Sequence, residues 1–144
     1  MLRNMSRVVA GFSFVIAAGL AYAAPILIVD VNGKLTSARN VDVGGIVYDV
    51  DFRDGTCVGL FSGCDNPATD FAFTTQADAT AASATLLSLV LIDGPQGLFD
   101  SAPQNLQGCN QSLCLILTPY TLSQIGPNAI DAAVVLNFPA IRQF

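Results

Sequence analysis

Hydrophobic and polar residues alternate most regularly along IVYDVDF, residues 46–52. Every second residue of this run, starting with the first, is apolar, while Asp49 and Asp51 fall on the opposite, mostly polar face. Such alternation is typical of a half-buried antiparallel strand. Because a Gly-Gly dipeptide precedes the run, we expect a hairpin in which residues 41–43 pair with it.

A second hairpin is predicted nearer the N-terminus. The run PILIVDV, residues 25–31, is rich in β-branched residues, and KLTSARNVDV, residues 34–43, follows after Asn32-Gly33. Asn-Gly between two such runs is the strongest short-range hairpin signal, because both residues tolerate the positive φ of a tight turn. This part of the chain is therefore expected to form antiparallel strands.

One segment, residues 74–92, has the periodicity of an α-helix. Thr75 is followed three residues later by Asp78, a spacing that predicts an N-terminal cap and an acid near the positive end of the helix dipole. The end of the segment, ATLLSLVLI, also fits a strand, and the turn residues at 93–95 end it in either case. The apolar stripe of the helix is expected to consist of Ala79, Ala82, Leu86, Leu89 and Val90.

The C-terminal part of the chain is predicted to return to strands. Residues 96–111 are expected to form a loop, and a buried strand should run from Leu113 to Thr118, where Pro119 interrupts it. The last strand is predicted in AIDAAVVLNF, residues 129–138. Strands, one helix and then strands indicate an α+β fold, with a small antiparallel sheet, one packed helix and disulfide-stapled loops.

Residues 1–23 have the three-part pattern of a secretory signal peptide. Arg3 and Arg7 precede the apolar run VVAGFSFVIAAGLA, and AYA, which ends at Ala23, fits a signal-peptidase site. The run is shorter than the ~20 residues of a membrane-spanning helix, and an uncleaved anchor is the alternative. We expect cleavage after Ala23, which leaves residues 24–144 as a single secreted α+β domain with no stable membrane span.

Four cysteines form two close pairs, Cys57 with Cys64 and Cys109 with Cys114. Disulfides persist in the oxidising compartments that exported proteins reach. Four cysteines can be paired in three ways. We favour the connectivity with two local disulfides, one within each close pair, because each disulfide then closes a short, turn-rich loop. By the loop-entropy argument, such loops contribute roughly 2–3 kcal/mol each. A four-thiolate zinc site is the alternative, but neither pair has the two-residue spacing of a zinc knuckle.

The acidic stretch YDVDFRDGTC, residues 48–57, raises the question of a calcium site. An EF-hand loop needs acids at its first, third and fifth positions, glycine at the sixth and glutamate at the twelfth. Here the third acid and the glycine each come one residue late, and the chain has no glutamate. A looser calcium site formed by Asp51, Asp54 and Asp65 is kept as an alternative, because secreted acidic loops do bind calcium. No other metal and no cofactor is assigned.

Charge and composition exclude several classes of function. Without the signal peptide the chain carries four basic residues and eleven aspartates, a net charge of −7, which repels nucleic acids and anionic lipids. The chain has no histidine, no nucleophile-elbow motif and no phosphate-binding glycine loop. Paired aspartates could still perform glycosidase-type chemistry, although eleven aspartates make a close pair expected by chance. We therefore expect no enzymatic activity and assign no catalytic residue.

Residues 40–82, followed later by GPQGLFDSAPQNLQGC and LTPY, resemble small exported bacterial proteins of the PEP-CTERM kind, which an exosortase sorts to the cell surface or matrix. The most specific part is a strand followed by Asp-Gly-Thr-Cys and Gly-Cys-Asp. The resemblance extends from about Val41 to Asn137 and implies a location more than an activity. Such proteins usually end in a Pro-Glu-Pro motif, an apolar anchor and an arginine cluster. This chain ends in VVLNFPAIRQF, with Pro139 and Arg142 but without that glutamate or anchor, so we expect a freely secreted relative or a truncated copy.

Together these features predict a non-enzymatic exported protein that is secreted, or associated with the cell surface or the extracellular matrix. Its expected partners are extracellular polysaccharide or surface proteins, besides the signal peptidase that processes it. The alternative is a small calcium- or glycan-binding module that uses the region Asp51–Asp65. A hydrolase built on aspartates is a third hypothesis.

Overall fold

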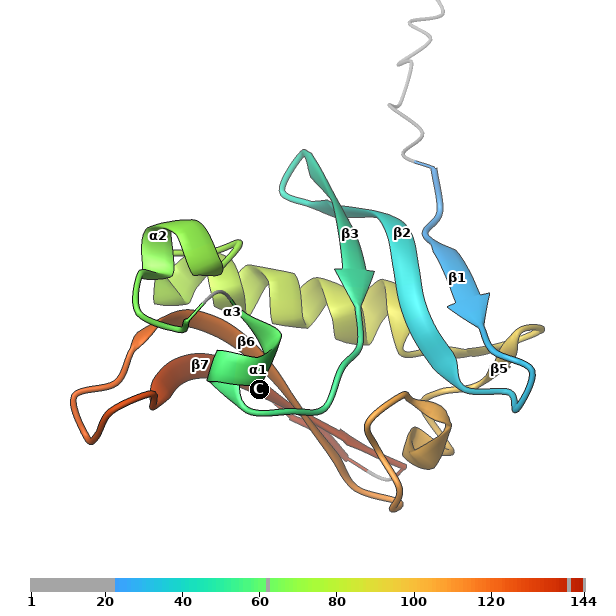
Figure 1. Ribbon diagram of the computed structural model, residues 1–144. Helices are drawn as coiled ribbons and strands as arrows, with labels where there is room; N and C mark the ends of the chain where they lie inside the picture. Colours follow the sequence, from blue (N-terminus) through green and yellow to red (C-terminus); the bar gives the residue numbers. More distant parts are fainter. Residues whose placement is uncertain (1–22, 62, 140, 144) are drawn as a thin grey trace, which may run out of the picture.

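Two three-stranded antiparallel sheets and one long helix form the fold of the described residues, which are 23–61, 63–139 and 141–143 of a computed structural model (Figure 1). The prediction of an α+β fold is confirmed, with two three-stranded sheets and one two-stranded sheet in place of a single sheet. The first sheet, in the order β1-β2-β3, contains β1 (Ile26–Val29), β2 (Leu35–Val43) and β3 (Ile46–Asp51). The second sheet, in the order β6-β7-β8, contains β6 (Cys114–Leu122), β7 (Ile130–Phe138) and β8 (Ile141–Gln143).

Shorter elements connect the sheets. Between β3 and β6 the chain forms α1 (Cys57–Leu60), α2 (Pro67–Asp70), α3 (Gln76–Thr85), the π-helical turn η1 (Leu86–Val90), β4 (Asp93–Gly94), β5 (Gly97–Leu98) and the 3-10 turn η2 (Pro103–Asn105). The prediction of an uninterrupted loop over residues 96–111 is therefore wrong in part. Proline at the start of η2 supplies a φ suited to a helical turn. The predicted signal peptide lies outside the described residues, except for its last residue.

Both predicted hairpins are present. In the β1–β2 turn, Gly33 has a φ of +79°, and its N–H donates to the carbonyl oxygen of Asp30 at 3.0 Å. The carboxylate of Asp30 accepts from the N–H groups of Lys34 and Asn32 at 2.9 and 2.8 Å. The hydrogen bond from the Lys34 N–H is the main cause that holds the pKa of Asp30 below its usual value. The second hairpin joins β2 to β3 at the predicted Gly-Gly dipeptide.

Helix α3 begins at the predicted cap and ends in an unpredicted π-helical turn. The hydroxyl oxygen of Thr75 accepts a hydrogen bond from the N–H of Asp78 at 3.2 Å, which confirms the cap. At the other end, the N–H of Leu91 donates to the carbonyl oxygen of Leu86, five residues back, at 2.8 Å. A bond over five residues is the defining feature of a π-helix, whose turn is wider than that of an α-helix.

Leu87 faces the core near the end of this helix, and Leu89 does not. The predicted stripe placed Leu89 inward, but Leu89 is 44% exposed whereas Leu87 is 2% exposed. The buried positions Ala79, Ala82, Ser83, Leu86, Leu87 and Val90 have the spacing of one helical face, and Leu89 falls outside it. The prediction for Leu89 is therefore wrong, whereas the other four residues of the predicted stripe are buried.

Strand β6 continues through Pro119, where the sequence predicted an end. Pro119 lies opposite Ala132 in the ladder, and the register shifts between Pro119 and Thr121. An edge strand tolerates proline because the position of the missing N–H can face away from the partner strand, and a bulge absorbs the local distortion. The predicted strand ending at Thr118 was thus too short, whereas the last predicted strand is confirmed as β7.

Helix α3 and η1 unite the two sheets around one hydrophobic core. Figure 1 shows α3 passing behind β2 and β3 and above β6 and β7. The hydroxyl of the fully buried Ser83 donates to Thr118 of β6 at 2.8 Å, and the side-chain amide of buried Asn137 donates to the carbonyl oxygen of Phe99 at 2.7 Å. The core consists of Leu35, Ala38, Val41, Phe52, Leu86, Leu87, Val90, Leu91, Phe99, Leu106, Cys114, Ile116 and Val135.

Replacing Leu87 by alanine should lower the free energy of unfolding by about 2–5 kcal/mol, because the truncation leaves a cavity in the core. The matched control is Leu89→Ala in the same turn, which should change the free energy of unfolding by at most about 0.5 kcal/mol because that side chain is half in solvent. Urea unfolding followed by circular dichroism measures both. Equal losses for the two variants would contradict the inward orientation of Leu87.

Candidate functional site

Both predicted disulfides are present. The Cα atoms of Cys57 and Cys64 lie 5.6 Å apart and those of Cys109 and Cys114 lie 5.7 Å apart. Both distances fall within the usual disulfide range of about 4.4–6.8 Å. Because all four cysteines are paired, none serves as a ligand in the zinc site considered as the alternative.

A cleft of about 500 Å³ lies between the first sheet and strand β6. Strand β3 and the loop that follows it form one wall, and β6 forms the opposite wall. The rest comes from β2, α1, the loop before α3, α3, η1, the loop before β6 and the first residue of β7. Its volume is within the range of about 300–1,000 Å³ that is typical of ligand sites. Its apolar lining includes Val50, Phe52, Leu60, Phe73, Leu106 and Ile116.

The cleft lies against the edges of two strands, and it also touches one face of the first sheet at Val41 and Val43 of β2. Successive residues of a strand point to opposite faces, so a cavity on one face would touch every second residue. Here residues 48–51 of β3 and residues 114–119 of β6 line the cleft without a gap. Both strands are terminal in their sheets. Their open edges therefore form two of the cleft walls.

Backbone groups of β3 point into this space. The N–H of Phe52 donates to the carbonyl oxygen of Thr36 on β2 at 2.9 Å. Because backbone groups alternate between the two edges of a strand, those of Asp51 and Asp49 face the other way, toward the cleft. Within the described part of the chain, no backbone hydrogen bond joins the edges of β3 and β6 across the cleft.

Aromatic rings occupy the end of the cleft near the short helices. The ring centroids of Tyr48 and Phe73 lie 5.1 Å apart, and those of Phe61 and Phe71 lie 5.0 Å apart in an edge-to-face arrangement. These separations are those of favourable aromatic pairs. Tyr48, Phe61 and Phe73 line the cleft, whereas Phe71, which packs against Phe61, is buried. The rings therefore hold the loop of the short helices against β3.

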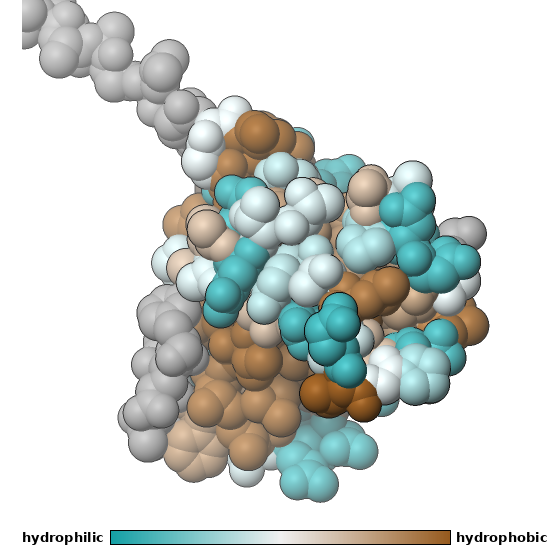
Figure 2. Space-filling model, turned by 90° about the vertical axis from the view of Figure 1, so that its left-hand side faces the viewer, coloured by the Kyte–Doolittle hydropathy of each residue, from teal (hydrophilic) through white to brown (hydrophobic). Residues whose placement is uncertain are grey.

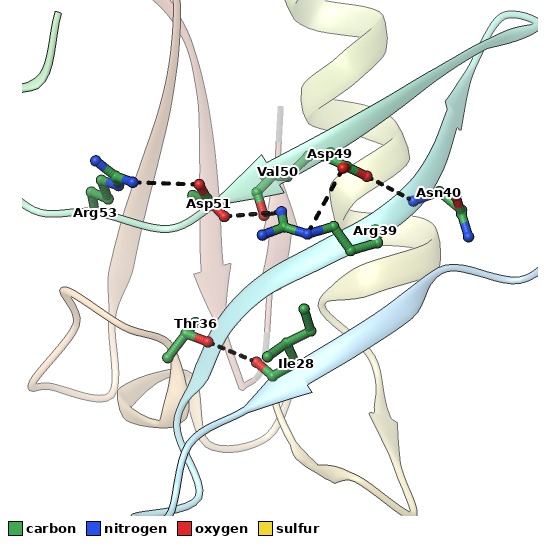
Figure 3. A network of polar contacts seen from close by, with 8 residues as sticks. All are labelled: Ile28, Thr36, Arg39, Asn40, Asp49, Val50, Asp51 and Arg53. Atoms are coloured by element: carbon green, nitrogen blue, oxygen red, sulfur yellow. Dashed lines mark hydrogen bonds and ion pairs between the residues drawn. The ribbon is translucent and has the colours of Figure 1, made fainter.

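Charged residues of β2 and β3 form a network beside the cleft (Figure 3). Arg39 lies between two carboxylates, with guanidinium nitrogens 2.9 Å from Asp51 and 3.8 Å from Asp49. Arg53 lies 3.5 Å from the second oxygen of Asp51, and Asp49 also accepts from the N–H of Asn40 at 3.3 Å. Exposed ion pairs of this kind contribute at most about 1 kcal/mol each. The acids of the YDVDF run thus link β2 to β3.

The three aspartates considered as a calcium site are not brought together. Asp51 is engaged by two arginines, Asp54 lies beside Gly108, and the N–H of Asp65 donates to the carboxylate of Asp70 at 3.1 Å. In the described ranges, no three histidine, cysteine, aspartate or glutamate side chains are placed to hold a metal ion. The acidic stretch is therefore part strand and part turn.

Lys34 has a structural role that sequence reasoning missed. Its ammonium group donates to the carbonyl oxygens of Gln104 and Cys109 at 2.9 and 3.0 Å, and the N–H of Gln107 donates to the carbonyl oxygen of Leu35 at 2.9 Å. These bonds tie the β1–β2 hairpin to a loop that forms part of the cleft wall. The sequence contains no signal for a contact between residues 70 positions apart.

Strand β6 exposes hydrophobic side chains although the sequence predicted that it is buried. Leu115 and Leu117 are 59% and 54% exposed, and Val134, which lies opposite Leu117 on β7, is 45% exposed. Figure 2 shows the side of the molecule that lies on the left in Figure 1. Hydrophobic side chains gather there in one broad area in the lower part, at the level of β6 and β7. The prediction was wrong because an apolar run alone does not show whether one face or both faces of a strand are covered.

No protein-family model, curated protein or solved structure matches this chain. A search of the described residues for a helix that is long and apolar enough to cross a membrane finds none. Inference about function therefore depends on the cleft, its charges and the two disulfides.

Millimolar calcium should leave the melting temperature unchanged, because an ion that does not bind the folded state cannot stabilise it. Differential scanning fluorimetry with calcium, and with magnesium as an ionic-strength control, measures this. A calcium-specific rise that is lost in Asp65→Asn but kept in Asp131→Asn would contradict the separation of the three aspartates and restore the calcium site.

Proposed function

We propose that this protein is an exported, non-enzymatic binding protein that acts outside the cytoplasm, either secreted or held at the cell surface or in the extracellular matrix. Two disulfides within one small domain support export, because disulfides persist in oxidising compartments. The signal-peptide pattern and the resemblance to exosortase-sorted proteins of the PEP-CTERM kind agree with the same location.

The cleft between β3 and β6 is the observation that carries the binding part of the proposal. It combines apolar walls, aromatic rings and a small number of polar groups, which is the usual composition of a ligand site. Apolar surface that a ligand removes from water contributes about 25 cal/mol per Å². Because the disulfide-bonded Cys57, Cys109 and Cys114 all line the cleft, part of its wall is held by covalent links before a ligand arrives.

The chemistry of the cleft favours binding over catalysis. The chain contains no histidine, which removes the commonest general base. Both carboxylate oxygens of Asp51 are engaged by arginines, Arg39 on one side and Arg53 on the other. A hydrolase built on aspartates needs two carboxylates free to exchange protons with substrate, so this pairing favours a structural role for Asp51.

An apolar molecule is the first candidate ligand and a glycan is the second. A specific observation favours the glycan. Three aromatic rings that could lie flat against a sugar line the same cleft as charged hydrogen-bonding groups. A glycan would depend on these rings and charges, whereas an apolar ligand would depend on the aliphatic walls. The groups concerned are Tyr48, Phe61, Phe73, Asp51, Arg53 and Asp54.

The protein isolated from the medium or cell surface of its host should begin at Ala24 and be four hydrogens lighter than its fully reduced form. Intact-mass spectrometry measures both properties. Treatment with iodoacetamide before reduction should add no mass, because the four thiols are paired. A full-length chain recovered from the cytosol, with thiols that react without reduction, would contradict export.

A further inference from the structure

We infer that the cleft receives an extended polypeptide strand from a partner, and that this strand adds to the open edge of β6. The inference rests on the proposed function, because it takes the cleft as the binding surface, and it specifies the class of ligand. The strand that fits is uncharged and rich in β-branched residues along its length and cationic at one end.

The edge of β6 is the first reason for this inference. Natural proteins protect edge strands with charged residues, prolines, bulges or covering segments, because unpaired backbone groups attract other strands. Strand β3 carries two aspartates on its exposed face, whereas β6 has no charged residue, and its proline and register shift lie only from Pro119 onward. Six consecutive residues of β6 line the cleft, so the edge opens into the ligand site itself. An extended peptide satisfies such a row of donors and acceptors by β-strand addition.

The side chains on both faces of β6 set the composition of the added strand. A strand beside β6 places alternate side chains next to those of β6 on each face of the sheet. On the outer face these neighbours are Leu115 and Leu117, and on the inner face they are Ile116 and the cleft residue Leu106. Because both sets are apolar, the partner strand should be uncharged and rich in β-branched residues where it meets β6.

The charge of the opposite wall determines which charge the end of the partner strand should carry. Three aspartates and one arginine line the cleft, and Arg39 and Arg53 already pair with Asp49 and Asp51. Among these described residues, Asp54 is the carboxylate without an ion pair and is therefore the charge that a cationic group can meet. The whole chain also has an excess of acids, with a net charge of −5. A second copy of this acidic chain would bring like charges to the cleft, whereas a lysine or arginine at the end of a partner strand would be attracted. The charges therefore favour a basic-ended partner over self-association.

A synthetic peptide tests strand addition directly. The ligand is a fluorescein-labelled, capped peptide that alternates valine with threonine and ends in two lysines, titrated with the disulfide-bonded protein in a fluorescence anisotropy assay. Two further peptides carry N-methyl groups on one or the other set of alternate residues. Because alternate N–H groups of a strand point to opposite edges, one set should abolish binding and the other should change affinity by no more than about twofold. Equal effects of the two sets would overturn strand addition.

Matched variants test the position of the strand. Leu117→Lys places a charge on the edge strand, and we expect it to weaken peptide binding by about tenfold or more. Val134→Lys places the same charge directly opposite on the central strand β7, on the same face and with similar exposure, and should change affinity by less than about threefold. Urea unfolding confirms that both variants are folded. Equal losses of affinity would overturn the assignment to the β6 edge.

Two control measurements separate failure of this inference from failure of the proposed function. In the first outcome the peptide does not bind, but the apolar dye ANS binds, and Leu60→Arg in the cleft wall abolishes binding of the dye. The cleft is then a binding surface, and strand addition is wrong. If neither peptide nor dye binds, both proposals are wrong. Size-exclusion chromatography shows whether the protein forms a dimer and whether Leu117→Lys dissociates it. Such a dimer would show that a second copy of this chain occupies the β6 edge, and the proposal of a partner with a basic end would be wrong.

Discussion

The packing of one helix against two separate sheets is the interaction on which the rest of this structure depends. The α3–η1 segment contacts β2 on one side and β6 and β7 on the other, and its leucines share one core with both sheets. The sheets do not pair with each other, so each keeps an open edge where they approach, at β3 and at β6. The cleft between those edges follows directly from this arrangement.

A few specific contacts hold the walls of the cleft in a chain with little charge. Only 12% of the residues are charged, and the ion pairs of Arg39 and Arg53 are exposed pairs that contribute little. The stronger constraints are the disulfides, the bond between Ser83 and Thr118 that joins α3 to β6, and the Lys34 ammonium that holds the loop before β6. A site fixed before its ligand arrives loses less conformational entropy on binding.

Local signals in the sequence predicted the local features of this fold. The Asn-Gly and Gly-Gly dipeptides indicated both hairpins, Thr75 with Asp78 indicated the helix start, and the close cysteine spacing indicated both disulfides. In each case the interacting groups lie within a few residues of one another, so their chemistry is visible in the sequence.

Features that depend on distant contacts could not be predicted in the same way. The exposed face of β6, the division into two sheets and the contacts of Lys34 all depend on which segments meet in three dimensions. The π-helical turn at the end of α3 was also missed, because no residue type in the segment specifies it. The acids of the candidate calcium site lie close together in the sequence, but the pairing of Asp51 with two arginines was missed for the same reason.

Amide hydrogen exchange along β6, measured by NMR on the disulfide-bonded protein, tests the open edge most directly. In an antiparallel edge strand only every second N–H is bonded to the neighbouring strand. If the edge of β6 is open, protected and rapidly exchanging amides should alternate from Leu115 to Thr118, with the unprotected ones facing the cleft. Uniform protection of all these amides in the free protein would show that the edge is already paired, and would contradict the cleft between two open strands.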